Sequence, residues 1–285
     1  MANGTLYVVS TPIGNLEDIS LRALRLLREA ALIAAEDTRH TRKLLNHYQI
    51  ETSATAYHEH NKLTRLDFIL DKLHNGLNVA LVSDAGTPCL SDPGWELVRA
   101  CLAEGIPVDA IPGPAAPLMA LVLSGFPVQE FTYVGFPPRK KNELQAFFTR
   151  LRPEAKRRPL VLFEAPHRLV ATLEVALEVL GDRPVAVARE LTKLHQEVRR
   201  ENLSTALAYF RENDPRGEFT IVLAPPEGET AEVEPEENTA APIDPVARLQ
   251  ELKASGLRAK AAIETVAHET GLNRRQLYAS WLELS

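Results

Sequence analysis

Residues 79–94 read VALVSDAGTPCLSDPG, and this stretch decides the fold. The first four residues are apolar without alternation, which is typical of a short parallel strand covered on both faces. The next twelve, Ser83 to Gly94, are mostly small, polar or proline, and they predict a stiff loop before a helix that starts near Trp95. Such a loop after a buried strand is more often a binding loop than a plain connection.

Four other apolar runs predict similar strands, namely residues 6–9, 160–163, 185–188 and 219–223. Leucine stripes at helical spacing lie between them, at residues 21–31 and at 169–180, where Gly181 ends the second helix. This alternation predicts an α/β fold with mostly parallel sheets. Ligands of such folds bind beyond the carboxyl ends of the strands, so the functional residues are expected in the loops that follow strands.

The composition is that of a globular protein. Of the 285 residues, 45% are hydrophobic and 25% are charged. The two cysteines form no CxxC pair, so a disulfide framework and a cysteine-based zinc site are not expected. The longest near-apolar stretch, residues 115–123, contains Pro117 and is too short for a membrane span, and no secretory signal is visible. We expect a cytoplasmic protein without a membrane partner.

The distribution of charge and proline predicts four regions. Residues 225–245 hold five prolines and seven acidic residues without lysine or arginine, which predicts a linker. Before it we expect an N-terminal α/β domain at 1–136 and a C-terminal α/β domain at 137–224, and after it a helical appendage at 246–285. The net charge of −6 becomes +1 without the seven linker acids.

A basic segment follows the expected domain boundary. Residues 139–158 contain eight basic and two acidic side chains. Local fields govern association with polyanions more than total charge does, so this segment is compatible with RNA binding. A solvated helix face is the alternative.

The loop after the first strand, residues 10–15, contains a single glycine, Gly14. It therefore matches neither the dinucleotide fingerprint nor the phosphate-binding loop, and it suits a ligand without phosphates. A structural turn is the alternative. In the loop after residues 79–82, Ala85 and Gly86 leave room for a flat ligand, while Asp84 and Asp92 can accept hydrogen bonds. Asp92 can instead cap the following helix.

A third loop, residues 111–116, leads into an apolar helix. Its small residues permit close approach, and free backbone N–H groups at a helix start can hold a carboxylate. A tight packing corner between strand and helix is the alternative.

Charged residues at strand ends are the catalytic candidates. Glu36, Asp37, Arg39 and His40 follow the apolar run 31–35. One of the carboxylates can act as a general base, and Arg39 can hold a phosphate through two hydrogen bonds. The alternative is a helix cap with a local ion pair.

Lys193 follows another predicted strand. A desolvated lysine can act as a base, and the alternatives are a phosphate contact or a solvated end. His58 and His60 lack a clear third ligand, so no metal site is expected.

Several motifs occur together in order along residues 4–224. They are TPIGN at 11–15, AEDTRHT at 35–41, DAGTP at 84–88, SDPG at 91–94, PGP at 112–114, RELTK at 189–193 and GEFT at 217–220. Together they resemble the tetrapyrrole-methylase class, and more specifically the ribosomal RNA small subunit methyltransferase I family. Glu164, His167 and Arg168 extend the match.

The resemblance implies two α/β domains with S-adenosylmethionine in the cleft between them, usually in a homodimer. It also implies transfer to the ribose 2′-hydroxyl of cytidine 1402 in the decoding centre of 16S ribosomal RNA, within the small ribosomal subunit. Whether Asp84 or Thr87 makes the polar cofactor contact stays open. The positions implied to contact the cofactor are Pro12, Ile13, Gly14, Asp84, Ala85, Gly86, Thr87, Leu90, Ala115, Ala116, Glu164 and Leu191.

Two other functions compete with this interpretation. A methylase of a small corrinoid or porphyrinoid substrate would need neither the basic segment nor the appended helices. A nucleic-acid-binding regulator that only senses a ligand would not need so many charged strand-end residues. In the appendage, Ala262, Ile263 and Val266 form one helical stripe, and Leu277 with Trp281 forms another. This pattern predicts a helix-turn-helix, with a helical hairpin that only packs as the alternative.

Overall fold

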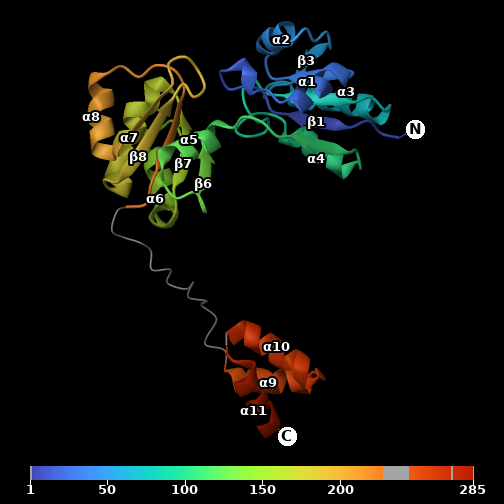
Figure 1. Cartoon of the computed structure of the whole chain (residues 1–285), viewed down its shortest axis with the longest axis vertical. Helices are drawn as coiled ribbons and strands as arrows, with labels where there is room; N and C mark the ends of the chain where they lie inside the picture. The colour runs from blue at the N-terminus through green and yellow to red at the C-terminus, as the bar shows by residue number, and fades with distance from the viewer. Residues whose placement is uncertain (1, 227–243, 271, 285) are drawn as a thin grey trace. The chain divides into compact units, whose positions relative to one another are not determined.

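A computed structural model divides the chain into two compact units, residues 1–230 and 231–285 (Figure 1). It describes residues 2–226, 244–270 and 272–284. Most of the predicted linker, residues 225–245, lies outside the described residues. Within the described ranges, no helix is long and apolar enough to cross a membrane.

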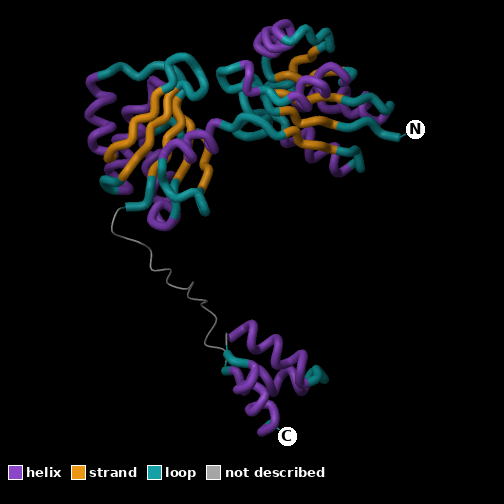
Figure 2. Tube along the Cα trace, viewed as in Figure 1, coloured by secondary structure: helices purple, strands orange, loops and turns teal. Residues whose placement is uncertain are grey.

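The first sheet is entirely parallel and has the strand order β3-β2-β4-β1-β5. Figure 2 shows strands in orange with helices in purple beside them. The quoted strand β4 lies at the centre of this sheet, and each of its residues is buried. Its strands are β1 (Leu6–Val9), β2 (Leu32–Ala35), β3 (Ala54–Ala56), β4 (Val79–Val82) and β5 (Val108–Ile111). The helices that connect them are α1 (Leu21–Glu29), α2 (Thr38–His47), α3 (Lys62–His74) and α4 (Trp95–Ala103).

The second sheet is mixed, with the order β6-β7-β10-β8-β9. Its strands are β6 (Thr132–Gly135), β7 (Leu160–Glu164), β8 (Pro184–Arg189), β9 (Glu197–Asn202) and β10 (Phe219–Leu223). Its helices are α5 (Ala116–Ser124), α6 (Lys141–Arg157), α7 (Leu169–Leu180) and α8 (Leu203–Glu212). Only β6 and β7 pair in parallel, while β10 runs antiparallel to both β7 and β8.

The expectation of mostly parallel sheets is therefore wrong for the second sheet. Residues 190–196 connect β8 to β9, and this connection is shorter than the dozen or so residues that a parallel crossover needs. The β7–α7–β8 unit does run as the alternation predicts. The last strand, β10, then inserts between its two strands in the opposite direction.

The second sheet also begins earlier than expected. Helix α5 packs its Ala120 and Leu121 against Val161 and Val222 of the second sheet, and β6 pairs with β7. Residues up to 136 were expected in the first domain. The sequence of an apolar helix does not indicate which sheet it packs against. Composition alone therefore could not assign α5 to the second sheet.

The five strands expected from apolar runs are all present. Strand β9 was not expected because its sequence EVRREN is polar, as suits its place at the edge of the second sheet. Helices α1 and α7 match the leucine stripes, and Gly181 follows α7 at a φ of +79°.

The smaller unit contains three helices among its described residues, α9 (Pro245–Ala254), α10 (Ala259–Thr270) and α11 (Arg274–Glu283). The two predicted stripes are confirmed, since Val266 of α10 and Leu277 of α11 share one core with Leu249 of α9. Asn273 caps α11 by accepting a hydrogen bond from the Arg275 backbone N–H. Gly271, part of the expected turn, lies outside the described residues.

Candidate functional site

Three loops at the carboxyl edge of the first sheet are bonded to one another. Thr11 and Gly86 exchange two backbone hydrogen bonds, with N···O distances of 2.9 and 3.0 Å. The Thr87 hydroxyl donates to the Pro114 carbonyl at 3.2 Å and accepts from the Ser10 hydroxyl at 3.1 Å. The loops after β1, β4 and β5 therefore meet at this edge of the sheet.

Small residues are needed where these loops meet. Gly86 has a φ of +80°, and a Cβ there would lie 3.3 Å from Ile13 Cγ2. A Cβ on Gly113 would lie 2.7 Å from Ser10 Cβ. The second loop also holds two non-glycine residues at positive φ, Cys89 and Ser91. Such conformations persist where the surrounding structure fixes them, and they are common at functional sites.

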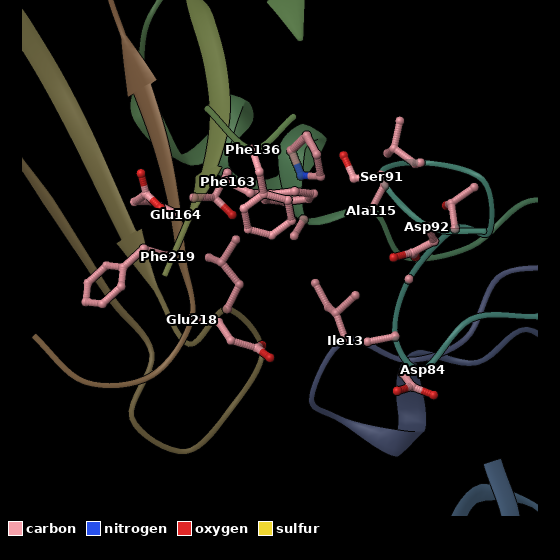
Figure 3. Close-up of a pocket in the computed structure, with 18 of the residues that line it drawn as sticks. Ile13, Asp84, Ser91, Asp92, Ala115, Phe136, Phe163, Glu164, Glu218 and Phe219 are labelled. Atoms are coloured by element: carbon pink, nitrogen blue, oxygen red, sulfur yellow. The ribbon is translucent and has the colours of Figure 1, made fainter. Parts of the chain in front are cut away.

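A cavity of about 390 Å³ lies beside these loops, within the usual size range of small-molecule sites. Figure 3 shows Ile13, Asp84 and Asp92 on one side of it, facing Phe163 and Glu218 on the other. Ten of the twelve expected cofactor positions line it, namely Ile13, Asp84, Ala85, Gly86, Thr87, Leu90, Ala115, Ala116, Glu164 and Leu191. Glu36, a catalytic candidate, lines it as well.

The other two expected cofactor positions lie elsewhere. Pro12 lines a smaller neighbouring cavity. Gly14 approaches the loop after β8, where a Cβ would lie 2.4 Å from Lys193 Cγ and 2.9 Å from Thr192 Oγ1. The Asn15 backbone N–H also donates to Thr192 Oγ1 at 3.2 Å. Gly14 therefore permits contact between two loops rather than lining the larger cavity.

The wall formed by the second sheet includes residues that precede a strand. Phe219 opens β10 and pairs in register with Glu164 at the end of β7 and Arg189 at the end of β8. Because β10 is antiparallel to both, Glu218 lies at the same edge as the loops that follow them. Glu218 was not predicted as a site residue because it precedes a strand, and only the antiparallel direction of β10 brings it to this edge.

The carboxylate of Glu164 is buried and fully engaged. It accepts a hydrogen bond from the Ala165 backbone N–H at 2.8 Å and another from the Thr172 hydroxyl. Arg168 Nε lies 3.3 Å from it and extends the network, since Arg168 also donates to the Pro137 carbonyl at 2.6 Å. Glu164 thus fixes the end of β7 in the cavity wall.

Three carboxyl groups gather on the first-sheet side. Burial raises the pKa of Glu36, with the charge of Asp84 adding to the shift. Burial also raises the pKa of Asp92 to about 7, with the charge of Glu36 adding to it. Like charges at reduced solvent exposure favour a bound cation. Asp92 does not cap α4, because Gly94 occupies the N-cap position and supplies no side-chain cap.

Asp37 and Arg39 form the cap and ion pair that sequence reasoning held as the alternative. Asp37 caps α2 by accepting from the Arg39 backbone N–H at 2.8 Å, and Arg39 Nη2 lies 2.6 Å from its carboxylate. The side-chain hydrogen bond from Arg39 holds the pKa of Asp37 well below its usual range, which makes Asp37 a poor base. The Arg39 side chain is 87% exposed and can still contact a ligand.

Lys193 is a paired cation. Its Nζ lies 2.9 Å from Glu190 and 2.9 Å from Glu218. Partial burial lowers the pKa of Lys193, but the hydrogen bonds to Glu218 and Glu190 outweigh burial and raise it. A raised pKa favours the charged ammonium form of Lys193 over a neutral base, and this group lies beside the Glu218 wall of the cavity.

His58 and His60 lie with their ring centroids 6.0 Å apart. In the part of the chain that the structure describes, no group of three or more His, Cys, Asp or Glu side chains is placed to hold a metal ion.

Comparison with known proteins identifies the family. The model of the tetrapyrrole (corrin/porphyrin) methylases matches residues 5–207. The chain is 46% identical to ribosomal RNA small subunit methyltransferase I of Halalkalibacterium halodurans, covering 96% of this chain and 93% of that protein. The Synechocystis protein of the same name is 48% identical, covering 99% and 98%. The chain belongs to the ribosomal RNA small subunit methyltransferase I family of tetrapyrrole methylases.

This membership confirms the resemblance and the fold class. The family member from Thermotoga maritima is 50% identical over 221 residues, covering 78% of this chain and 98% of that protein. Because the match covers nearly all of the Thermotoga protein, the part of this chain outside the match has almost no counterpart in it.

Solved structures of two methylases share the fold. Uroporphyrin-III-C-methyltransferase from Thermus thermophilus is 22% identical with a TM-score of 0.56, covering 78% of this chain and 94% of that one. Cobalt precorrin-4 methyltransferase is 16% identical with a TM-score of 0.58, covering 77% and 94%. At these identities the likeness concerns the fold alone.

The raised pKa of Asp92 predicts a stability effect. Between about pH 4 and pH 7 folded Asp92 keeps a proton that the unfolded chain releases, so its contribution to stability falls as pH rises. We expect Asp92→Asn to raise the free energy of unfolding at pH 8 by on the order of 1 kcal/mol, after allowance for solvent screening. Urea unfolding measured at pH 4 and pH 8 tests this.

The gain in the free energy of unfolding from Asp92→Asn should be smaller at pH 4 than at pH 8. Asp67→Asn on the exposed face of α3 controls for loss of a surface charge. An equal gain at both pH values, or a loss at pH 8, would contradict the assignment of a raised pKa to Asp92.

Proposed function

We propose that this chain transfers a methyl group from S-adenosylmethionine to the ribose 2′-hydroxyl of cytidine 1402 in 16S ribosomal RNA. The observation that carries the proposal is its identity of 46–48%, over nearly the full length of both chains, to proteins named ribosomal RNA small subunit methyltransferase I. The shared fold of corrin and porphyrin methylases is compatible with it but cannot select the substrate.

The larger cavity fits S-adenosylmethionine. The rings of Phe136 and Phe163, with centroids 5.2 Å apart, provide an apolar surface for an adenine ring, and the backbone at Ala85–Gly86 permits close approach. Asp84 and Glu218 are carboxylates in the lining that favour a sulfonium cation. When bound, the cofactor supplies an electrophilic methyl group. The cofactor positions expected from the sequence that line this cavity are the proposed contacts.

Glu36 and Asp92 are the proposed proton acceptors. A ribose hydroxyl is a poor nucleophile, and a base whose pKa lies near the working pH accepts its proton most effectively. Both carboxyl groups line the cavity and have raised pKa values. Asp37 instead positions Arg39, and Arg39 with Lys193 is proposed to contact RNA phosphates.

Two basic regions support an RNA partner. The exposed side chains of Arg139, Lys141 and Arg150 lie on or next to α6. In the smaller unit, Arg275 follows the cap of α11. We propose that residues 225–245 tether this helical unit to the α/β body and that both regions bind rRNA phosphates in the cytoplasm.

The rate of transfer should depend on pH through the proton acceptor. For the wild type we expect kcat to rise as pH increases through about 7, because Asp92 must be ionised to accept a proton. Asp92→Asn should lower kcat by about 100-fold, within the usual contribution of a general base, and flatten the profile. If Asp92→Asn keeps the wild-type kcat and its dependence on pH, Asp92 is not the proton acceptor.

The substrate is tested by transfer of labelled methyl groups to 30S subunits lacking the modification, to naked 16S rRNA and to uroporphyrinogen. We expect label in the RNA of the ribosomal substrate, recovered as a 2′-O-methylated cytidine that resists alkaline hydrolysis. Label on uroporphyrinogen alone would contradict the proposal. Binding of the cofactor without transfer to any substrate would favour a ligand-sensing regulator.

We also propose that the chain forms a homodimer through α5. This helix is apolar on both faces, and while Leu121 is buried, Leu118, Met119 and Val122 are 46%, 40% and 65% exposed. A helix that is apolar all round is usually buried, so a second copy is the proposed cover.

Light scattering of the purified protein tests the dimer. We expect a dimer for the wild type and a monomer for Val122→Glu. Leu102→Glu, at a residue of α4 that is 63% exposed, is the matched control and should remain dimeric. A monomeric wild type would contradict the proposal.

A further inference from the structure

A second cavity of about 120 Å³ adjoins the larger one on the first-sheet side. Asp84 lines both cavities, so the smaller one opens next to the carboxyl groups of the larger one. Its lining combines the loop after β1, the start of α2 and the end of β4, and consists of Thr11, Pro12, Leu16, His40, Thr41, Lys43, Leu44, Ser83 and Asp84. The function proposed above assigns no role to it.

One buried hydroxyl group in this lining, Thr41 Oγ1, has no hydrogen-bond partner among the described residues, and Thr41 is only 5% exposed. The hydroxyl of Ser83 instead faces the Asp92 carboxyl group as a hydrogen-bond partner. An unpaired buried hydroxyl is costly, so Thr41 needs an explanation. A ligand with a hydrogen-bonding atom on its rim would supply the missing partner.

The rest of the lining narrows the chemistry of that ligand. Pro12, Leu16 and Leu44 form apolar walls, as the faces of a flat ring require. Asp84 offers a carboxylate that accepts hydrogen bonds from an amino group. The volume of about 120 Å³ is smaller than the cavity of about 150 Å³ that encloses benzene, so a six-membered ring would enter it only in part.

Cationic side chains stand at the start of α2. His40 and Lys43 line the cavity while their residues are otherwise exposed, and Arg42 lies between them in sequence. Neither Arg42 nor Lys43 forms an ion pair with any other described residue. These groups are free to contact phosphates on either side of a nucleotide whose ring enters the cavity.

We propose that this cavity receives the cytosine base of the target nucleotide, turned out of the RNA strand. The Asp84 carboxylate accepts a hydrogen bond from the exocyclic amino group, and the hydroxyl of Thr41 donates to the ring nitrogen. Uracil presents a carbonyl where cytosine has its amino group, so Asp84 would repel it. Sequence-specific RNA recognition commonly reads a splayed-out base in this way.

The arrangement also places the ribose. With the base beside Thr41 and Ser83, the sugar lies at the Asp84 boundary between the two cavities, on the side of the larger cavity where Figure 3 shows Asp84 and Asp92. The 2′-hydroxyl is then next to the proposed proton acceptors. This inference rests on the proposed function and extends it by naming what selects cytidine.

Methylation of 30S subunits by the full chain tests the inference. Thr41→Val removes the hydroxyl at nearly constant volume, and we expect kcat/KM for the subunit to fall about 10-fold, as for loss of one hydrogen bond. Thr41→Ser keeps the hydroxyl and should recover most of the activity. Cofactor affinity, measured by calorimetry, should stay within about twofold of the wild type in each variant.

The control variant and the specificity test distinguish the loss of a contact with the base from a general loss of activity. Thr64→Val, at an exposed position of α3, should leave kcat/KM unchanged. Subunits reconstituted with uridine at the target position should be poor substrates for the wild type. Thr41→Val should reduce the preference for cytidine over uridine.

The outcomes distinguish the two proposals. Failure of the wild type to methylate any ribosomal substrate would overturn the proposed function and this inference with it. Wild-type transfer to cytidine that Thr41→Val leaves unchanged, both in rate and in preference over uridine, would overturn the inference alone.

Discussion

The reciprocal backbone hydrogen bonds between Thr11 and Gly86 are the contact on which the site depends. They hold the loops after β1 and β4 together at the carboxyl edge of a parallel sheet, where strand ends leave backbone groups available. Gly86 permits the contact because its φ is positive and no Cβ meets Ile13. The larger cavity lies on one side of this junction, and the smaller cavity adjoins it at Asp84.

This junction also concentrates charge. The loop after β4 carries Asp84 and Asp92, and the loop after β2 brings Glu36 close to both. Folding therefore places like charges at reduced exposure, which costs stability and raises the pKa values that the proposed chemistry uses. Lys193 and Glu218 add a charged pair from the second sheet. Stability lost at such a site is a common cost of function.

Apolar runs such as 79–82 and 185–188 were sufficient to predict the central strands of both sheets, and the small-residue turns of the first sheet also carry a direct signal. They were not sufficient for the edge strands or for the strand directions of the second sheet. The polar strand β9 resembles a loop, and nothing in residues 219–223 indicates that β10 inserts antiparallel between β7 and β8. Glu218 was missed for that reason, while Thr41 was missed because an unpaired buried hydroxyl is visible only in three dimensions.

A crystal structure of the chain soaked with S-adenosylmethionine tests the central claim most directly. The account predicts the sulfonium between the Ile13 and Gly86 loops on one side and Phe163 with Leu191 on the other, with Thr11 and Gly86 still bonded. Density for the cofactor at another place, or loops separated so that the Thr11–Gly86 bonds are absent, would contradict it.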